Sequence, residues 1–136
     1  MKNIEVCAAI IIKENKIFVT QRGYGQFKDM WEFPGGKIEL NESKSDCIIR
    51  EIKEEMDADI EVVKHLNTIE YDYETFHLTM HNLICKLKNE HINLLEHEAA
   101  KWVDANELMT IDFLPADLLV LEDLLNYLSS PNGEIM

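Results

Sequence analysis

The chain has 136 residues, 46% of them hydrophobic, and its 26 Asp and Glu against 13 Lys and Arg give a formal net charge of -13 at pH 7. This length predicts one domain, residues 1–136, with a buried core. No apolar run approaches the ~20 residues of a membrane span. The acidic balance argues against a nucleic acid polymer as partner.

The chain begins with two predicted strands, Ile4–Lys13 and Lys16–Arg22, joined by a tight turn at Glu14-Asn15. The apolar stretch Val6–Ile12 lacks a small-residue cleavage site, so we interpret it as a strand and not as a signal peptide. Three widely spaced cysteines lie in apolar segments: Cys7, Cys47 and Cys85. This pattern is typical of buried, reduced thiols and favours a cytoplasmic protein.

A glycine turn and a helix follow. The segment Trp31–Lys37 contains Gly35 and Gly36, which allow unusual backbone conformations and a close approach to a ligand. Ser43 is then expected to cap a helix over Ser43–Met56, with Asp46 at its N3 position. Apolar residues at helical spacing predict its buried stripe: Cys47, Ile48, Ile49, Ile52 and Met56.

The next predicted element is a long hairpin of Glu61–Tyr73 and Thr75–Leu87, where Phe76, Leu78 and Met80 alternate with other residues. A short strand is expected at Lys101–Val103. A turn of helix capped by Asp104 follows it.

The chain is expected to close with one helix, Leu118–Leu128, stopped by Pro131. Five leucines at helical spacing predict its inner face: Leu118, Leu121, Leu124, Leu125 and Leu128. We interpret this stripe as core.

The first predicted helix carries the chemistry. Glu51, Glu54 and Glu55 stand at i, i+3 and i+4 and so share one face. Crowded carboxylates repel one another unless a cation lies among them, and hard oxygen ligands suit Mg²⁺ or Mn²⁺. Arg50 could orient Glu51 through a charge-assisted hydrogen bond. The alternative is a solvated acidic helix face.

The spacing of these residues resembles the signature of the Nudix hydrolases, G-x5-E-x7-R-E-U-x-E-E-x-G-U, where U is a bulky aliphatic residue. Six positions match: Gly36, Glu42, Arg50, Glu51, Glu54 and Glu55. The segments Ile4–Arg22, Trp31–Lys37 and Phe113–Asp117 are similar to the MutT-like branch. Within that branch the likeness is to CTP pyrophosphohydrolases and 8-oxo-dGTP diphosphatases.

The resemblance implies an α/β (α+β) fold, the α/β/α sandwich of the Nudix enzymes, with a mixed β-sheet between helices. It also implies hydrolysis of a nucleoside triphosphate to the monophosphate and pyrophosphate, with water attacking the β-phosphorus. The implied metal ligands are Gly35 (through its carbonyl), Glu51, Glu54, Glu55 and Glu96, with Glu98 as the rival of Glu96. Glu51 would also activate the water, while Gly36, Glu42 and Arg50 would support the site.

One position departs from the signature, because Asp57 stands where the family has Gly. A residue just past a helix end is often left-handed, and Asp tolerates that conformation better than most residues. We expect a modest cost in stability and intact chemistry.

The resemblance also implies a base pocket. Arg22 would reach the phosphate or sugar, Glu32 and Phe33 would lie beside the base, and Phe76 or Leu78 would offer a packing surface. Asp117 would contact the base itself. An ionised Asp only accepts hydrogen bonds, which suits the amino group of cytosine or the N7–H of 8-oxoguanine. The alternative is that Asp117 only caps the closing helix.

Three functions remain open on these residues. The first is Mg²⁺-dependent hydrolysis of CTP, dCTP or modified forms, or of 8-oxo-dGTP, in nucleotide pool sanitising and DNA repair. The second is hydrolysis of another nucleoside diphosphate derivative, and the third is a nucleotide sensor without activity. We expect a monomer or homodimer that binds no membrane.

Overall fold

The computed structural model describes residues 1–95 and 99–130. The first half contains β1 (Lys2–Lys13), β2 (Lys16–Gln21), β3 (Trp31–Glu32), β4 (Gly35–Lys37) and α1 (Lys44–Met56). The second half contains β5 (Ile60–Asp72), β6 (Phe76–Leu87), β7 (Ala99–Asp104), the 3₁₀ helix η1 (Ala105–Thr110), α2 (Pro115–Leu118) and α3 (Leu121–Ser129). The predicted strands and the first helix are therefore confirmed to within a few residues.

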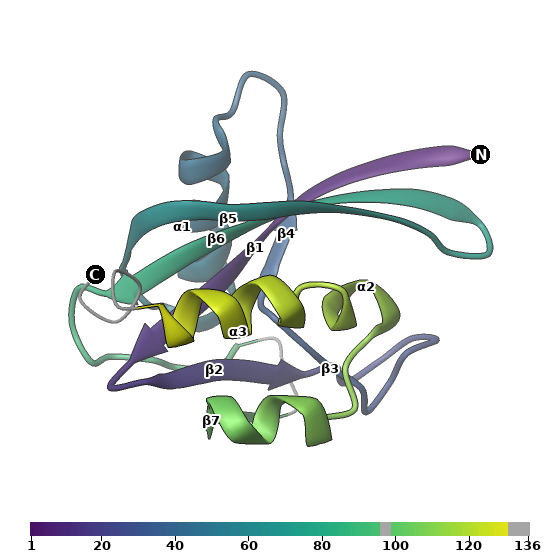
Figure 1. Cartoon of the computed structure of the whole chain (residues 1–136). Helices are drawn as coiled ribbons and strands as arrows, with labels where there is room; N and C mark the ends of the chain where they lie inside the picture. Colours follow the sequence, from purple (N-terminus) through teal and green to yellow (C-terminus); the bar gives the residue numbers. More distant parts are fainter. Residues whose placement is uncertain (96–98, 131–136) are drawn as a thin grey trace.

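The strands form a mixed sheet with β1 at its centre (Figure 1). Its order is β3-β2-β1-β6-β5, with β4 paired to β1 and β7 paired to β2. Among the described pairs of strands only β1 and β6 run parallel, and an isolated bridge between Trp31 and Phe113 is also parallel. The mixed sheet that the sequence predicted is confirmed.

The β1–β2 connection is the expected tight turn. Glu14 and Asn15 both have positive φ, 52° and 64°. Two successive left-handed residues match the right-handed twist of the strands in a two-residue hairpin.

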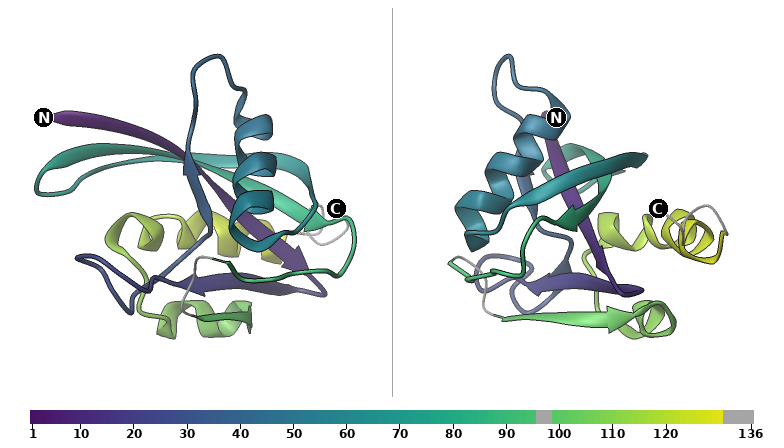
Figure 2. Two further views of the ribbon diagram at one scale, coloured as in Figure 1. Left: turned by 180° about the vertical axis from the view of Figure 1, so that it is seen from behind. Right: turned by 90° about the vertical axis from the view of Figure 1, so that its left-hand side faces the viewer.

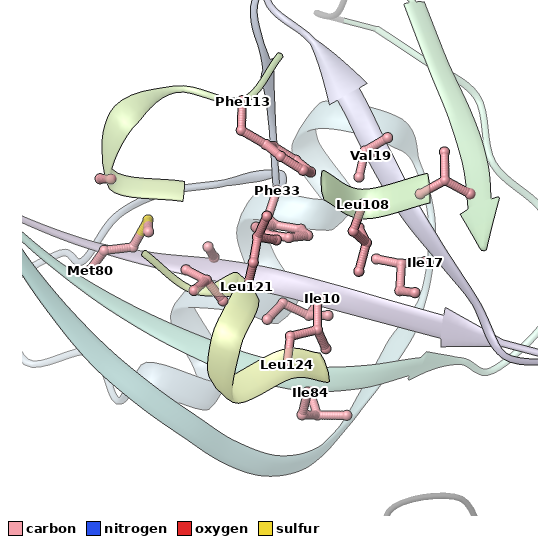
Figure 3. Packing of buried hydrophobic residues seen from close by; sticks show 14 of the residues in the cluster. Ile10, Ile17, Val19, Phe33, Met80, Ile84, Leu108, Phe113, Leu121 and Leu124 are labelled. Carbon is pink, nitrogen blue, oxygen red and sulfur yellow. The ribbon is translucent and has the colours of Figure 1, made fainter. Parts of the chain in front are cut away.

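Helices cover both faces of the sheet, as Figure 2 shows for α1 and α3. Successive residues of β1 point to opposite faces, so Cys7, Ala9 and Ile11 pack under α1 while Ala8 and Ile10 face α3. Figure 3 shows the buried cluster on the α3 side of the sheet, which includes Ile10, Phe33 and Phe113. This layering confirms the predicted helix–sheet–helix architecture.

The inner face of α1 is narrower than predicted. Cys47, Ile48, Ile52 and Met56 are buried, but Ile49 is 41% exposed. Ile49 lies about 200° from Cys47 around the helix, so it falls at the edge of the face that buries Cys47 and Ile48.

The closing helix is two helices, not one. Leu118 and Leu119 are about half exposed (48% and 49%), and Val120 is the N-cap of α3. The prediction that Leu118 is core is wrong, whereas Leu121 and Leu124 are buried and Leu125 and Leu128 partly so. The four residues from Leu118 to Leu121 are all apolar, so the sequence does not specify which of them face the core. With the helix broken here, Asp117 is buried in α2, and Leu121 and Leu124 are buried in α3.

The three cysteines are free and buried, as predicted. Burial raises the pKa of the Cys85 thiol to about 12. Within the described residues, no helix combines the length and apolar character that crossing a bilayer requires.

Candidate active site

Both ends of α1 have the caps that the sequence suggested. Ser43 Oγ accepts the backbone N–H of Asp46 at 3.0 Å. Asp57 follows the last turn with φ 50° and ψ 35°, the left-handed conformation, and its N–H donates to Lys53 O at 3.0 Å. These caps satisfy backbone groups at the two ends of the helix and so define where it begins and ends.

Two of the three helix glutamates line a cavity of about 460 Å³, together with Gly35 and Gly36. Glu55 is buried and Glu51 nearly so, with 15% of its side chain exposed. Glu54 is instead 58% exposed and accepts a 3.0 Å hydrogen bond from Arg50. Two carboxylates of the expected shared face thus lie in the cavity, and the third, Glu54, lies outside the set of described residues that line it.

Arg50 ties these groups to the preceding loop. Its Nε and Nη2 donate to the two carboxylate oxygens of Glu42 at 2.7 and 3.0 Å, and Nη2 also donates to Lys37 O at 3.1 Å. Glu51 lies 3.6 Å from Nη1. The hydrogen bonds from Arg50 lower the pKa of Glu42 to about 2.

Gly35 is required by space, and Gly36 is required for the observed position of the Glu51 side chain. A Cβ on Gly35 would lie 1.9 Å from the carbonyl oxygen of Cys7, and one on Gly36 would lie 2.2 Å from the Glu51 carboxylate. Neither glycine has a positive φ, so the unusual backbone conformation that the sequence allowed for is not used. The close approach of neighbouring atoms is the reason for glycine at these positions. Gly36 therefore allows the Glu51 side chain to lie against the β4 backbone.

The donor set fits a divalent metal ion. Glu51 and Glu55 are largely withdrawn from water and face one cavity in a strongly acidic chain, so a bound cation would relieve their repulsion. Among residues 1–95 and 99–130, however, no three acidic, His or Cys side chains already converge on one point. Leu95 donates its N–H to Glu55 O at 2.8 Å, while Glu96 and Glu98 lie outside the described residues.

All six residues predicted to bind the substrate line the same cavity: Arg22, Glu32, Phe33, Phe76, Leu78 and Asp117. Arg22 and Glu32 form a fork, with Nη2–Oε1 and Nε–Oε2 distances of 2.8 and 3.3 Å. Sequence reasoning missed further lining residues, among them Phe27, Tyr73 and Leu114. These residues come from separate segments of the sequence. The only pattern that could have indicated one of them is the alternation of Tyr71 and Tyr73 around the end of β5.

Asp117 is 4% exposed, and its Oδ2 accepts the backbone N–H of Phe33 at 2.9 Å. It lies inside α2, whose N-cap is Leu114, so its side chain is not the cap of a closing helix. Burial raises the pKa of Asp117 to about 8, although the Phe33 N–H acts against this. The raised pKa favours the neutral carboxyl, which donates as well as accepts, over the ionised, acceptor-only form expected from the sequence.

The comparison with protein families decides the assignment, since the model of the NUDIX domain matches residues 7–123. The chain belongs to the Nudix family. The MutT-like resemblance is confirmed, and the chain is a Nudix pyrophosphohydrolase.

Relatives and solved structures agree with the family. The chain is 31% identical over 123 residues to a CTP pyrophosphohydrolase of Escherichia coli K12, covering 90% of this chain and 91% of the relative. It is 32% identical over 125 residues to an 8-oxo-dGTP diphosphatase of Buchnera aphidicola, covering 91% and 95%. The solution structure of the E. coli ORF135 protein superimposes with a TM-score of 0.83 at 28% identity, covering 96% and 94%.

Proposed function

We propose that this Nudix enzyme hydrolyses a (deoxy)nucleoside triphosphate to the monophosphate and pyrophosphate, with Mg²⁺ or Mn²⁺. The proposed substrates are CTP, dCTP or their modified forms, and 8-oxo-dGTP. One observation carries the proposal: a single cavity holds the Glu51 and Glu55 carboxylates and also the buried Asp117. Its volume of about 460 Å³ suits a small ligand, and its two ends differ in chemistry.

At the hydrolytic end, Glu51, Glu54, Glu55 and the Gly35 carbonyl would hold the metal. A bound divalent cation neutralises phosphate charge and lowers the pKa of the attacking water. Glu51 would orient that water, since its carboxylate lies against Gly36 and 3.6 Å from Arg50. Arg50 and Glu42 would fix the carboxylates, because phosphoryl transfer depends mainly on positioning and electrostatics.

Glu96 would complete the metal site. The support is its neighbour Leu95, whose N–H is bonded to Glu55 O at 2.8 Å. Glu96→Gln should lower kcat far more than Glu98→Gln, measured with the same triphosphate and Mg²⁺. The reverse order would assign the ligand to Glu98.

At the base end, Asp117 with its proton offers one donor and one acceptor. That pair matches N3 and the amino group of cytosine, and equally a keto oxygen and the N7–H of 8-oxoguanine. Relatives that act on each of these nucleotides support the same two candidates.

A pyrophosphate-release screen with Mg²⁺ tests the proposal over CTP, dCTP, 5-methyl-dCTP, 8-oxo-dGTP, dGTP and ADP-ribose. Glu51→Gln should abolish turnover, and Glu122→Gln, an exposed glutamate on α3, should not. A preference for cytosine nucleotides supports a CTP pyrophosphohydrolase, and one for 8-oxo-dGTP supports sanitising. Turnover of ADP-ribose alone would contradict the proposal and favour another nucleoside diphosphate derivative as the substrate. Binding of a nucleotide without turnover would contradict it in favour of a sensor.

A further inference from the structure

Tyr73 lies where the β5–β6 hairpin meets the cavity. It follows the end of β5, is 9% exposed, and belongs both to the cavity wall and to the core cluster under α3. Its ring stacks on Phe76 with centroids 5.0 Å apart and contacts Phe27 at 5.4 Å and Tyr71 at 4.7 Å. Aromatic packing on these sides gives the Tyr73 ring one orientation.

That orientation brings the phenol to the start of α2. Tyr73 Oη accepts the backbone N–H of Ala116 at 3.0 Å in a buried environment. The four-residue helix α2 has no cap from the side chain of its N-cap residue, Leu114. Tyr73 therefore satisfies an N–H at the helix start that a cap would otherwise bind, and it does so from a position 43 residues earlier in the chain (116 − 73 = 43).

Ala116 directly precedes Asp117, so the contact acts next to the carboxyl at the base end. Asp117 is fixed from the other side by the Phe33 N–H at 2.9 Å. The start of α2 is thus held between the end of β5 and the segment after β3. Loss of either contact would let the Asp117 carboxyl shift relative to the aromatic rings that line the cavity, those of Phe27, Tyr73 and Phe76.

We propose that Tyr73 is a specificity-determining positioning residue, which fixes Asp117 against the base through its hydrogen bond with Ala116. The inference rests on the proposed function, because the base is that of the proposed triphosphate. The hydrolytic end is built separately by α1 and β4, so Tyr73 should act on substrate choice and KM, and hardly on kcat.

Tyr73→Phe removes the hydroxyl and keeps the ring. Its KM for the preferred triphosphate should rise about fivefold or more, the factor expected if the shifted Asp117 loses one hydrogen bond to the base of about 1 kcal/mol. The ratio of kcat/KM between the preferred and the next base should fall by a similar factor, with kcat within about twofold.

Tyr127→Phe is the matched control. Tyr127 is also 9% exposed and belongs to the same core cluster, but it lies on α3 outside the set of described residues that line the cavity. It should leave KM and base preference unchanged. In the ligand-free protein, the Ala116 amide should exchange with solvent faster in Tyr73→Phe than in Tyr127→Phe.

The outcomes separate the two proposals. An active wild type whose KM and base preference survive Tyr73→Phe would overturn the role of Tyr73 alone. A fall in kcat that is equal for every base would also overturn it, because that pattern indicates general loosening. A wild type silent on every triphosphate would overturn the proposed function, and the role of Tyr73 in base choice with it.

Discussion

At the scale of single residues, the carboxyl of Asp117 links stability to substrate choice. The folded protein withdraws it from water and raises its pKa to about 8, while the unfolded chain returns it to an ordinary value near 3.8. Between these two values the folded state holds a proton that the unfolded state has lost. Raising the pH in that window therefore favours unfolding.

We predict that wild type loses stability relative to Asp117→Asn by roughly 1 kcal/mol per pH unit between pH 5 and pH 7. Urea unfolding at each pH measures the difference, and groups common to both proteins cancel. Glu42, with its pKa lowered to about 2, stays ionised throughout. Asp112→Asn, at an exposed position, is the control and should run parallel to wild type; parallel curves for Asp117→Asn would contradict the raised pKa.

Arg50 shows why the charge of a side chain is not enough. Lysine at this position would keep the charge but lose the two-pronged contact with Glu42 and the bond to Lys37 O. We predict that Arg50→Lys lowers kcat on the order of tenfold with a smaller change in KM, because misplaced carboxylates impair the chemical step. Steady-state kinetics measures both; Lys53→Arg, at an exposed position on the same helix, should behave as wild type.

At the scale of elements, α1 depends on its N-cap. Ser43→Ala removes the acceptor of the Asp46 N–H and should cost about 1 kcal/mol of unfolding free energy. The folded fraction should keep its kcat, because Glu51 and Glu55 lie about two and three turns further along the helix. Ser45→Ala, in the exposed first turn, should cost less, and equal losses for the two serines would deny the cap its role.

The C-terminal end of α1 gives a prediction of near-neutrality. Asp57→Gly relieves a left-handed non-glycine residue but removes contacts with Lys53 Nζ at 3.2 Å and His91 Nε2 at 3.0 Å. These effects oppose each other at a partly exposed site, so we expect a small change in Tm and nearly unchanged turnover. A large rise in activity would show that the family glycine has a catalytic consequence.

Elements with a clear period could be predicted from the sequence, and those without one could not. The spacing of Ile48, Ile52 and Met56 gave α1 almost to the residue, and alternation gave β5 and β6. The run from Leu118 to Leu121 has no period, so the break before α3 is visible only in the structure.

The site divides in the same way. Glu51, Glu54 and Glu55 follow from local spacing, but the outward turn of Glu54 depends on Arg50 and the loop before α1. The contact of Asp117 with Phe33 joins residues 84 positions apart (117 − 33 = 84), and the burial that raises its pKa depends on the whole fold, so no local pattern records either. Tyr73 was missed for the same reason, since its partner Ala116 belongs to another element.

At the scale of the whole molecule, a net charge of -13 opposes the binding of a polyphosphate. Divalent cations resolve this conflict by neutralising both the substrate and the cavity carboxylates. We predict no measurable turnover in excess EDTA and full recovery when Mg²⁺ is restored above the chelator. Pyrophosphate release is the measurement, and activity that persists in EDTA would require a different source of positive charge.

The parallel pairing of β1 with β6 has a consequence for how the chain folds during its synthesis. The pairs run from Lys2–Phe76 to Ile11–Cys85, so each joins residues 74 positions apart (76 − 2 and 85 − 11). The entire Nudix motif, residues 36–58, precedes β6, the parallel neighbour of the central strand, along the chain and is synthesised before it. Long-range strand pairing of this kind is slow. Until β6 is available, the edge of β1 that pairs with it stays unpaired, and a chaperone could shield this apolar strand. The catalytic motif is thus complete early in translation, while the sheet that supports it closes only after β6 has emerged.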